Sequence, residues 1–496
     1  MLNIFQEDTK FTDTKELIKD IYLADERPWV VGFSGGKDST AVVQAIFNAL
    51  MDLQPEQLTK KVYIISSDTL VETPLIINKI TTTLGKMQDS AIELGLPIET
   101  HKIRPSIEKT FWASLIGKGY PSPRQKFRWC TDRLKIEPAN RFILEKVSQF
   151  GEVIMVLGVR DTESASRANV MQQHSIEGKN LMRHSTLPNA YVFAPIRNFS
   201  TDDVWEYLLQ SGLSPWGEDN NELLRLYQDS NSECPLVVDK EIKESAGSCG
   251  NSRFGCWTCT VVSEDKALSG FINNGVTWLQ PLYEFRNFLY HIRNDRNARQ
   301  KQRMNGQVYL LSHIEGIDLD AAEKIHIDDL GTYLANNNID LANAEDLNLL
   351  IIDHDGELKQ LGVGPFTLKA REEILRKLLQ AQKKVQDLHD PSIELITIDE
   401  LKVIRQYWED DLDWEDRIPT IYEEETGLRL DWEENDRPAL AEDQITDLER
   451  LCMEENISLS VIKKLISIEK NYSGYKVRRG LQKEFEKTLK QDFLHL

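Results

Sequence analysis

WVVGFSGGKDST, residues 29–40, is the stretch that decides the fold. Its first five residues, Trp29 to Phe33, are mostly apolar and rich in valine and aromatics, as in a buried strand. A glycine-rich turn follows, and a helical pattern then runs from Thr40 to Leu50. In such a turn the glycines let the backbone approach an anion closely, and the helix N-terminus directs N–H groups and its positive dipole end at it. The stretch therefore predicts a phosphate-binding loop at the edge of an α/β sheet.

The loop itself, SGGKDS, carries the side chains that a phosphate site needs. Lys37 supplies a positive charge, and Ser34 and Ser39 supply hydroxyl donors. A plain glycine turn after a strand is the alternative, but six specific residues in the one suitable place favour a ligand site. We expect nucleotide contacts from Ser34, Gly35, Gly36, Lys37, Asp38 and Ser39, with Lys37 and Asp38 catalytic.

The spacing of the loop indicates which bond of the nucleotide is broken. Lys37 directly follows the second of two adjacent glycines, which is not the G-x-x-x-x-G-K-S/T spacing of the Walker loop. SGGKDS instead resembles the PP-loop of the ATP pyrophosphatase superfamily. Members cleave ATP between the α and β phosphates and adenylylate a substrate. The resemblance implies ATP and Mg²⁺ as cofactors and disfavours a γ-phosphate hydrolase.

Strand and helix patterns alternate through the first third of the chain, which is typical of a parallel sheet with crossover helices. We predict further strands at 62–66, 98–103 and 153–159 and helices at 75–94 and 136–147. The predicted fold is α/β, an open parallel sheet with helices on both faces, of the PP-loop ATP pyrophosphatase or adenine nucleotide α-hydrolase type. This domain is expected over 1–215, a cysteine-rich segment over 216–263, and a mostly helical region over 264–496, with helices at 278–296, 368–385, 398–407 and 457–468.

Polar residues also follow two other predicted strands. Residues 67–74, SDTLVETP, resemble the Asp-Thr-Gly segment and following Glu-Thr of phosphoadenylylsulfate reductases, with Leu70 in place of the glycine. The resemblance implies ligand contact by Asp68, for which a strand-end turn residue is the alternative. Gly158 and Arg160 end a later strand, and we expect both at the nucleotide, with Arg160 catalytic. Arg167 is a second arginine suited to an anion, although surface ion pairs are the alternative for each.

A further segment, residues 194–207, resembles the Pro-Ile and Asp-Val-Trp segment of the same reductases. Thr201 is expected to cap a helix there, and Trp205 is expected to lie in the core.

The cysteines point to a metal. Six in 496 residues are too few for a disulfide framework, and Cys256-x-x-Cys259 alone suits zinc, a redox pair or an iron–sulfur cluster. Residues 130–138, CTDRLKIEP, and 255–260, GCWTCT, resemble the two cysteine segments of iron–sulfur adenylylsulfate reductases, where four cysteines hold a 4Fe-4S cluster. Trp129 stands in place of one of those cysteines. The resemblance implies a 4Fe-4S cluster on Cys130, Cys256, Cys259 and a fourth residue, for which we expect Cys249, with Cys234 as the alternative. Cys452 is expected to be structural.

Charge is unevenly distributed along the chain, whose formal net charge is −21. Residues 409–449 hold seventeen acidic and three basic residues, which predicts a solvated surface or a docking surface for a basic partner. Residues 101–135 hold nine Lys or Arg against two acidic residues, which predicts a locally basic face. No apolar run approaches the roughly 18 residues of a membrane span, and the first residues do not resemble a signal peptide. We therefore expect a soluble, cytoplasmic protein with no membrane partner.

The order of motifs, with an acidic helical tail and no terminal cysteine of the kind that reductases use, is most similar to the DndC family, the sulfurtransferases of bacterial DNA phosphorothioation. This resemblance implies replacement of a non-bridging phosphate oxygen of DNA by sulfur. It implies as partners DNA, a cysteine desulfurase as sulfur donor, an SMC-like ATPase and a small DNA-binding subunit. The basic residues Arg124, Lys126 and Arg128 favour a DNA contact, whereas the bulk acidity opposes one. The alternatives are a tRNA thiolase or a sulfonucleotide (PAPS or APS) reductase on the same core, and a non-catalytic nucleotide-binding subunit.

Overall fold

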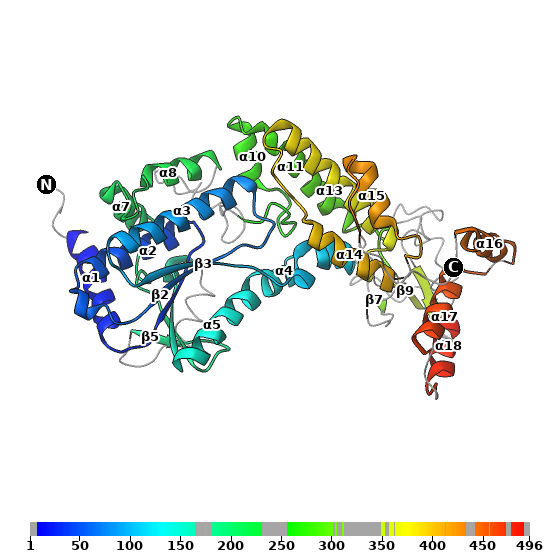
Figure 1. Ribbon diagram of the computed structural model, residues 1–496, viewed down its shortest axis with the longest axis horizontal. Helices are drawn as coiled ribbons and strands as arrows, with labels where there is room; N and C mark the ends of the chain where they lie inside the picture. The colour runs from blue at the N-terminus through cyan, green and yellow to red at the C-terminus, as the bar shows by residue number, and fades with distance from the viewer. Residues whose placement is uncertain are drawn as a thin grey trace. The chain divides into compact units, whose positions relative to one another are not determined.

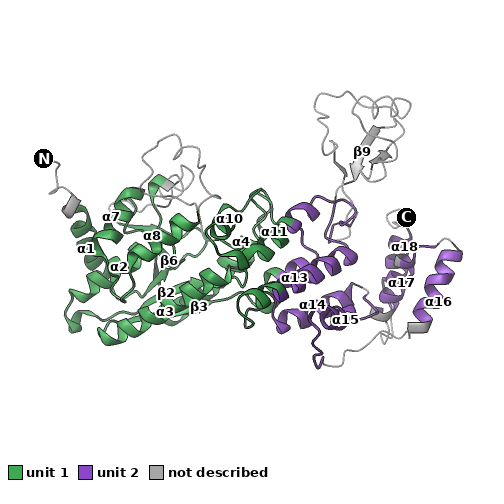
Figure 2. Ribbon diagram, turned by 90° about the horizontal axis from the view of Figure 1, so that it is seen from above, with its two compact units in different colours: residues 1–111, 123–287, 384–395 green, residues 112–122, 288–383, 396–496 purple. Residues whose placement is uncertain are grey.

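A computed structural model describes most of the chain (Figure 1). The described residues are 7–163, 174, 180–230, 255–300, 303–304, 310–311, 349–352, 357–361, 363–411, 413–432, 442–455, 457–472 and 478–490. The predictions for Arg167, Cys234 and Cys249 lie outside these residues. By its contacts the chain divides into two compact units (Figure 2): unit 1 is 1–111, 123–287 and 384–395, and unit 2 is 112–122, 288–383 and 396–496.

Unit 1 is built on a six-stranded sheet of order β3-β2-β1-β4-β6-β5. Its strands are β1 (Trp29–Gly32), β2 (Val62–Ser67), β3 (Ile98–Ile103), β4 (Val153–Val156), β5 (Leu181–Arg183) and β6 (Ala190–Phe193). All neighbours pair in parallel except β5, which runs antiparallel to β6 at the edge. The predicted open parallel sheet is confirmed, and the antiparallel edge strand was not predicted. The strand order reverses between β1 and β4, and such a switch point is where open α/β sheets bind ligands.

Helices cover both faces of this sheet, as predicted (Figure 1). On one side α2 packs against α1 and α7, and α3 packs against β3; on the other, α5 packs against β2, β3 and β4. Right-handed crossovers between neighbouring parallel strands place α2 and α3 on the same face. Among the described residues, the α-helices that lie wholly in unit 1 are α1 (Glu7–Leu23), α2 (Lys37–Met51), α3 (Pro74–Glu93), the short α4 (Trp129–Thr131), α5 (Glu137–Phe150), α7 (Thr201–Ser211), α8 (Asn220–Asp229) and α10 (Lys266–Asn273).

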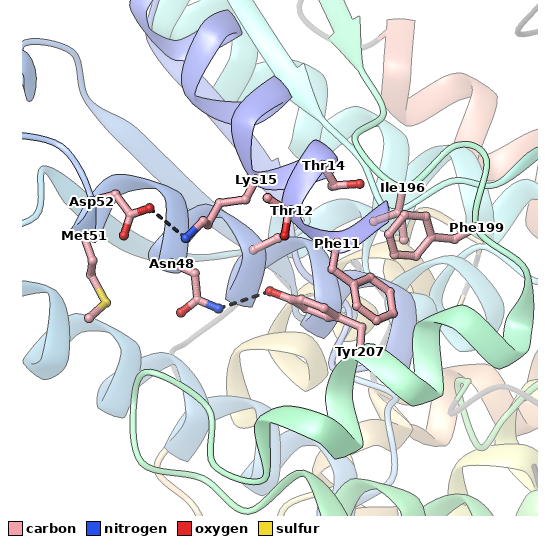
Figure 3. A pocket seen from close by; sticks show the side chains of 11 residues that line it. Phe11, Thr12, Thr14, Lys15, Asn48, Met51, Asp52, Ile196, Phe199 and Tyr207 are labelled. Carbon is pink, nitrogen blue, oxygen red and sulfur yellow. Dashed lines mark hydrogen bonds and ion pairs between the residues drawn. The ribbon is translucent and has the colours of Figure 1, made fainter. Parts of the chain in front are cut away.

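A cavity of about 320 Å³ lies where α1, α7 and the C-terminal half of α2 meet (Figure 3). Aromatic rings form part of its wall. Lys15 pairs with Asp52 at 2.7 Å, and Asn48 donates a hydrogen bond to the Tyr207 hydroxyl at 3.2 Å. Lys15 and Asn48 are therefore each paired with another residue that lines the cavity.

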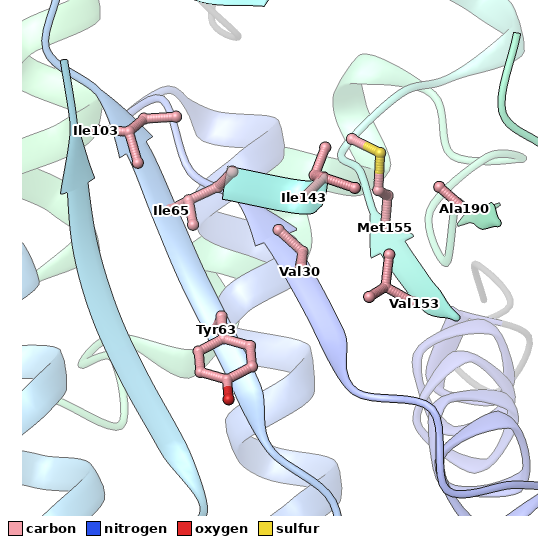
Figure 4. Close-up of a cluster of buried hydrophobic side chains, with 8 residues drawn as sticks. All are labelled: Val30, Tyr63, Ile65, Ile103, Ile143, Val153, Met155 and Ala190. Atoms are coloured by element: carbon pink, nitrogen blue, oxygen red, sulfur yellow. The ribbon is translucent and has the colours of Figure 1, made fainter. Parts of the chain in front are cut away.

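The core between the sheet and α5 follows from the alternation of side chains along the strands (Figure 4). In β1, β2 and β4 every second apolar residue faces α5, whose Ile143 lies fully buried among them. The buried residues of this cluster are Val30, Tyr63, Ile65, Ile103, Ile143, Val153, Met155 and Ala190. The intervening strand residues face the other layer of helices, so both faces of the central strands are apolar, as in other sheets of this kind.

Unit 2 contains a three-stranded antiparallel sheet of order β7-β9-β8 together with helices. The strands are β7 (Leu310–Leu311), β8 (Leu349–Ile352) and β9 (Glu357–Leu361), and the helices include α14 (Ile398–Asp410), α15 (Arg417–Thr426), α16 (Glu442–Glu454), α17 (Leu459–Tyr472) and α18 (Leu481–Lys490). Helices α11 (Gln280–Ile292) and α13 (Leu368–Leu388) have residues in both units. The mostly helical character was predicted; the small sheet was not, because strands of two to five residues are too short for an alternating pattern to stand out.

Within the described residues, no helix combines the length and the apolar character that crossing a membrane requires.

Candidate active site

The glycine-rich loop turns the chain from the end of β1 into α2, as the sequence predicts. Gly35 has a φ of +73°, a conformation that glycine adopts without strain, and Gly36 precedes the first helical residue, Lys37. The hydroxyl of Ser39 donates to the Gly36 carbonyl at 2.9 Å and accepts from the Ser34 amide at 3.2 Å. The serines thus fix the shape of the loop, in addition to the ligand contacts that the sequence predicts for them.

A chain of charges follows the loop. The Lys37 ammonium lies 3.4 Å from one carboxylate oxygen of Asp38, and Nε of Arg160 donates to the other at 2.6 Å. Arg160 comes from the loop that follows β4, on the opposite side of the switch point, and only 3% of its surface is exposed. Its Nη1 also donates to the hydroxyls of Thr162 (3.1 Å) and Thr201 (3.3 Å). The structure therefore brings together the three residues predicted to be catalytic.

Thr201 does not cap α7, contrary to the prediction. Ser200 is the N-cap: its hydroxyl accepts from the Asp203 amide at 3.1 Å, and the Asp203 carboxylate accepts from the Ser200 amide at 2.6 Å. This reciprocal capping box satisfies two amide groups at the helix end, which a cap at Thr201 would not do. Thr201 is thereby free to contact Arg160. Trp205, about one turn along the same helix, is 2% exposed and lies in the core as predicted.

Tyr227, on α8, was not singled out by sequence. Its hydroxyl accepts from the Lys37 amide at 3.1 Å, and the Lys37 ammonium lies 5.5 Å from the centre of its ring. It thus holds the amide at the start of α2 and contacts the lysine through its ring. The partners are 190 residues apart in the chain, and a tyrosine on an amphipathic helix gives no signal that separates this role from ordinary packing.

Gly158, predicted to contact the nucleotide, has a packing role in the structure. A Cβ at this position would lie 2.9 Å from the backbone carbon and oxygen of Asp38 and 3.0 Å from the Ser39 amide nitrogen. Real Cβ atoms essentially never approach backbone so closely, so only glycine lets the loop after β4 pass the first turn of α2.

We expect Gly158→Ala to lower the free energy of unfolding by about 1–3 kcal/mol, because the start of α2 must move away from the new methyl group. The same displacement should weaken ATP binding. Urea unfolding and calorimetric titration with ATP measure the two effects. Gly85→Ala is the matched control: nothing lies within 4 Å of its Cβ position in the middle of α3, and we expect a gain of up to about 1 kcal/mol. Equal stability of the two variants would contradict the packing role.

Asp68 lies at the end of β2 with only 3% of its surface exposed. One carboxylate oxygen accepts from the Leu70 amide at 3.1 Å, and the other accepts from Nε of Arg104 at 2.8 Å. Leu70 has a φ of +65°, the left-handed conformation that favours glycine. Leu70 stands where the similar reductases carry glycine, and its backbone has the left-handed conformation that glycine favours. This conformation costs leucine about 1–2 kcal/mol of conformational free energy.

The Cys256–Cys259 turn packs directly on the loop that follows Asp68. The Trp257 amide donates to the Val71 carbonyl at 3.0 Å, and Cys256 forms an isolated antiparallel bridge with Glu72. The Thr69 hydroxyl lies 3.5 Å from the Cys256 sulfur and donates to Glu72 at 2.6 Å. The thiols are thereby attached to the C-terminal end of β2, beside the strand that carries the phosphate loop.

Three predicted thiol ligands gather in this place. Cys130 interacts electrostatically with Cys259, and the ammonium of Lys135 interacts with Cys256, Cys130 and Cys259. All three cysteines are free thiols with partly accessible surface. In the part of the chain that the structure describes, no group of three His, Cys, Asp or Glu residues is arranged so that it could hold a metal ion.

Burial controls the protonation of these groups. It raises the pKa of Cys256 to about 12, against the opposing effect of Lys135, and it raises the pKa of Cys130 with help from Cys259. Burial also raises the pKa of Glu72. The pKa of Lys135 is raised too, and the largest cause is its interaction with Cys256 in the thiolate form. Cys130 and Cys256 therefore stay protonated at neutral pH, and binding of iron or zinc would release their protons. Thiol sulfur is the donor type that an iron–sulfur cluster takes, but the three described thiols are not arranged as a metal site in this structure.

Arg286, on α11, holds the carbonyl groups of the cysteine turn. Its side chain is fully buried, and Nε donates to the Cys259 carbonyl at 2.9 Å. Nη1 donates to the Ser263 carbonyl at 2.7 Å, and Nη2 donates to the Val262 carbonyl. One guanidinium thus satisfies three backbone acceptors and fixes the path of the chain after Cys259.

We expect Arg286→Gln to lower the free energy of unfolding by about 2–4 kcal/mol, since it leaves buried carbonyls without donors. It should also speed the reaction of Cys259 with a thiol reagent. Urea unfolding and the rate of modification by Ellman's reagent measure these effects. Arg197→Gln is the control, because Arg197 is a partly exposed arginine of the same unit paired with Asp161 at 2.9 Å. A thiol reactivity no different from that of Arg197→Gln would contradict the positioning role.

The two groups of predicted site residues share one edge of the sheet. The phosphate loop, Asp68 and Arg160 follow the C-terminal ends of β1, β2 and β4, which are parallel neighbours. The cavity at the C-terminal half of α2 lies toward the other end of that helix from the phosphate loop. The chemistry is therefore concentrated at the loop edge.

Comparison with known proteins adds a family match. Residues 28–262 match the family model described as the phosphoadenosine phosphosulfate reductase domain. An uncharacterised protein of Methanocaldococcus jannaschii is 30% identical over 193 residues, which are 39% of this chain and 34% of that protein. The match thus spans about a third of the length of this curated relative.

The solved structures that match the chain have low sequence identity and low TM-scores. A phosphoadenylyl-sulfate (PAPS) reductase from Candida auris in a phosphate complex is 15% identical, with a TM-score of 0.29 over 46% of this chain and 94% of that one. The U34-tRNA thiolase NcsA from Methanococcus maripaludis, with its 4Fe-4S cluster, is 11% identical, with a TM-score of 0.26 over 49% and 84%. An FMN adenylyltransferase from Candida glabrata is 15% identical, with a TM-score of 0.26 over 43% and 62%.

Proposed function

Because residues 28–262 form a phosphoadenosine phosphosulfate reductase-like PP-loop domain, we propose that the chain is a sulfurtransferase of DNA phosphorothioation that splits ATP into AMP and pyrophosphate. The observation that carries the proposal is a juxtaposition on neighbouring parallel strands. Lys37 and Asp38 follow the loop after β1, and the Cys256–Cys259 turn is hydrogen-bonded to the loop after β2. An anion-activating site and a sulfur-handling site therefore belong to one edge of one sheet.

The reaction needs ATP because a phosphate oxygen is a poor leaving group. In the proposed sequence, a non-bridging oxygen of the DNA phosphate attacks the α-phosphorus of ATP, and pyrophosphate leaves. A sulfur nucleophile then attacks the DNA phosphorus, and the oxygen departs with AMP. One ATP is thus consumed for each oxygen replaced by sulfur.

The residues of the loop suit the first step. Lys37 and the start of α2 stabilise the charge that develops on the departing pyrophosphate, and Arg160 orients Asp38 and adds positive charge nearby. Mg²⁺ in nucleotide sites takes one or two carboxylates together with phosphate oxygens, and Asp38 is the carboxylate within the loop. The Asp68 carboxylate accepts a hydrogen bond from Arg104. Its proposed role in ligand binding is therefore to hold the Arg104 guanidinium in place.

The thiols suit the second step. Cys130, Cys256 and Cys259, with Cys249 as fourth ligand, would hold a 4Fe-4S cluster, which supplies a site for binding or relaying sulfide. Lys135 retains a positive charge beside all three described thiols and so favours the arrival of an anionic sulfur species. Arg286 keeps the turn in place. A cysteine desulfurase is the proposed sulfur donor; its sulfur arrives as a persulfide, and a thiol reductant supplies the two electrons that cleave the S–S bond and leave sulfur on the DNA phosphorus. An SMC-like ATPase and a small DNA-binding subunit are the proposed further partners.

Deletion of the gene in its host tests this function. We expect phosphorothioate dinucleotides to disappear from nuclease-digested DNA, as read by mass spectrometry, and to return when the gene is restored. Nucleosides of tRNA from the same cells provide the comparison. Phosphorothioates that persist without the gene, or thiolated tRNA nucleosides that vanish in their place, would reject the DNA assignment; loss of sulfite production would favour a sulfonucleotide reductase.

A further inference from the structure

A short hairpin precedes the first cysteine of the thiol group. The Arg124 amide donates to the Phe127 carbonyl at 3.1 Å, and the Phe127 amide donates to the Arg124 carbonyl at 3.0 Å, which closes a turn with Gln125 and Lys126 at its tip. Lys126, Phe127 and Arg128 are all exposed to solvent. Phe127 exposes 44% of its surface although it belongs to a well-hydrogen-bonded turn. We call residues 124–128 the basic hairpin.

The basic hairpin is fixed to the thiol group at both ends. On its N-terminal side, the Pro123 carbonyl accepts a hydrogen bond from the buried Thr260 hydroxyl at 2.8 Å, next to Cys259. On its C-terminal side, Trp129 is buried and stacks on Phe111, with ring centres 5.4 Å apart and planes at 21°. Cys130 follows directly. A ligand held by the hairpin therefore lies near the thiols.

The three exposed side chains have the chemistry of a nucleic-acid contact. An exposed aromatic ring offers a face on which a base can stack, and cations on both sides of it in the sequence attract the neighbouring phosphates. Bases within a duplex are already stacked on each other, so the ring can serve only a base that has left the stack. The chain is acidic overall, but the hairpin lies within residues 101–135, the basic stretch of the sequence.

We propose that the basic hairpin binds an unpaired DNA strand, with Phe127 stacked on a base and with Lys126 and Arg128 on the adjoining phosphates. The backbone of that strand is thereby held beside Cys130 and Cys259, and the DNA is locally opened where sulfur is inserted. The choice of DNA rests on the proposed function. The stacking and the charge contacts rest on the geometry of the hairpin alone.

Binding of labelled oligonucleotides to the full chain, followed by fluorescence anisotropy without ATP or a sulfur donor, tests the proposal. We expect single-stranded DNA to bind more tightly than duplex DNA of the same sequence. Phe127→Ala should weaken single-strand binding about 5- to 100-fold without changing its salt dependence, because stacking involves no counterion. Phe127→Tyr should retain most of the affinity. Lys126→Gln and Arg128→Gln should each reduce the slope of log K against log salt by about 0.7.

Two control variants separate the hairpin from general surface effects. Phe150→Ala removes an equally exposed phenylalanine (48%) at the end of α5, and Lys61→Gln removes an exposed lysine before β2; both should bind like the unaltered chain. Affinity of Phe127→Ala equal to that of Phe150→Ala, equal binding of single and double strands, or tighter binding of single-stranded RNA would each overturn the proposal. Formation of DNA phosphorothioates is measured separately. A chain that binds single strands as expected but forms no phosphorothioates would reject the proposed function and not the hairpin.

Discussion

Lys37→Ala is expected to lower the rate of ATP-dependent pyrophosphate release by about two to three orders of magnitude, the usual effect of removing one group that stabilises charge in the transition state. The lysine is nearly buried at the start of α2, and its ammonium faces Asp38 and the ring of Tyr227. Its removal leaves Asp38 paired with Arg160. The fold should therefore remain intact, and the loss should concern the chemistry of the loop.

A coupled pyrophosphate assay measures this loss, and circular dichroism checks the fold. Lys61→Ala is the matched control, because Lys61 is an exposed lysine of the same unit that pairs with Glu99 outside the loop; it should release pyrophosphate at the unaltered rate. Pyrophosphate release by Lys37→Ala at the rate of Lys61→Ala would exclude the loop as the site of ATP cleavage.

Asp38 requires a different substitution. The structure pairs its carboxylate with the buried guanidinium of Arg160 at 2.6 Å. Breaking such a buried pair from one side typically costs about 3–5 kcal/mol. Asp38→Asn keeps an acceptor for Arg160 while removing the charge, so it separates loss of activity from loss of stability better than Asp38→Ala does.

Cys256→Ser is expected to remove nearly all iron from protein purified without oxygen, because the proposed cluster needs four thiolates and a serine hydroxyl is a poor ligand for iron of this kind. Cys256 lies in contact with Thr69 and beside Lys135. Cys130→Ser and Cys259→Ser should behave alike. Metal analysis and the visible absorbance of the cluster give the readout independently of activity.

Cys452→Ser provides the control for the cysteine variants. Cys452 is buried in α16, a helix of unit 2, and should retain full iron when replaced. Stoichiometric zinc without iron in the unaltered protein would reject the cluster. Full iron in Cys249→Ser would transfer the role of fourth ligand, with Cys234 as the next residue to test.

The parts of the site that the sequence predicts are those built from adjacent residues. Ser34 to Ser39 could be recognised because a strand, two glycines and a helix start follow one another directly, and the resulting geometry is local. The convergence of Lys37, Asp38 and Arg160 could be expected because strand ends of a parallel sheet share one edge. The gathering of Cys130 with Cys259 agrees with the resemblance of their two segments.

The parts that escaped prediction depend on distant partners. Arg286 donates to a carbonyl 27 residues earlier, and an isolated arginine on a helix has no pattern that reveals it. Gly158 could be noted as a loop glycine, but its close approach to the backbone of Asp38 is visible only in three dimensions. At Leu70 the backbone has the left-handed conformation that favours glycine, although the residue is leucine. Hydrogen bonds on both sides hold this conformation: the Leu70 amide donates to Asp68, and the Trp257 amide of the cysteine turn donates to the Val71 carbonyl.

The identity of the product formed from ATP labelled in its α-phosphate tests the central claim most directly. The purified chain, supplied with its sulfur donor and DNA, should convert the label to AMP in amounts equal to the pyrophosphate released, and Lys37→Ala should leave it in ATP. Accumulation of labelled ADP would mean that the γ-phosphate is the group removed, and it would contradict the assignment of Ser34 to Ser39 as a loop that directs cleavage between the α and β phosphates.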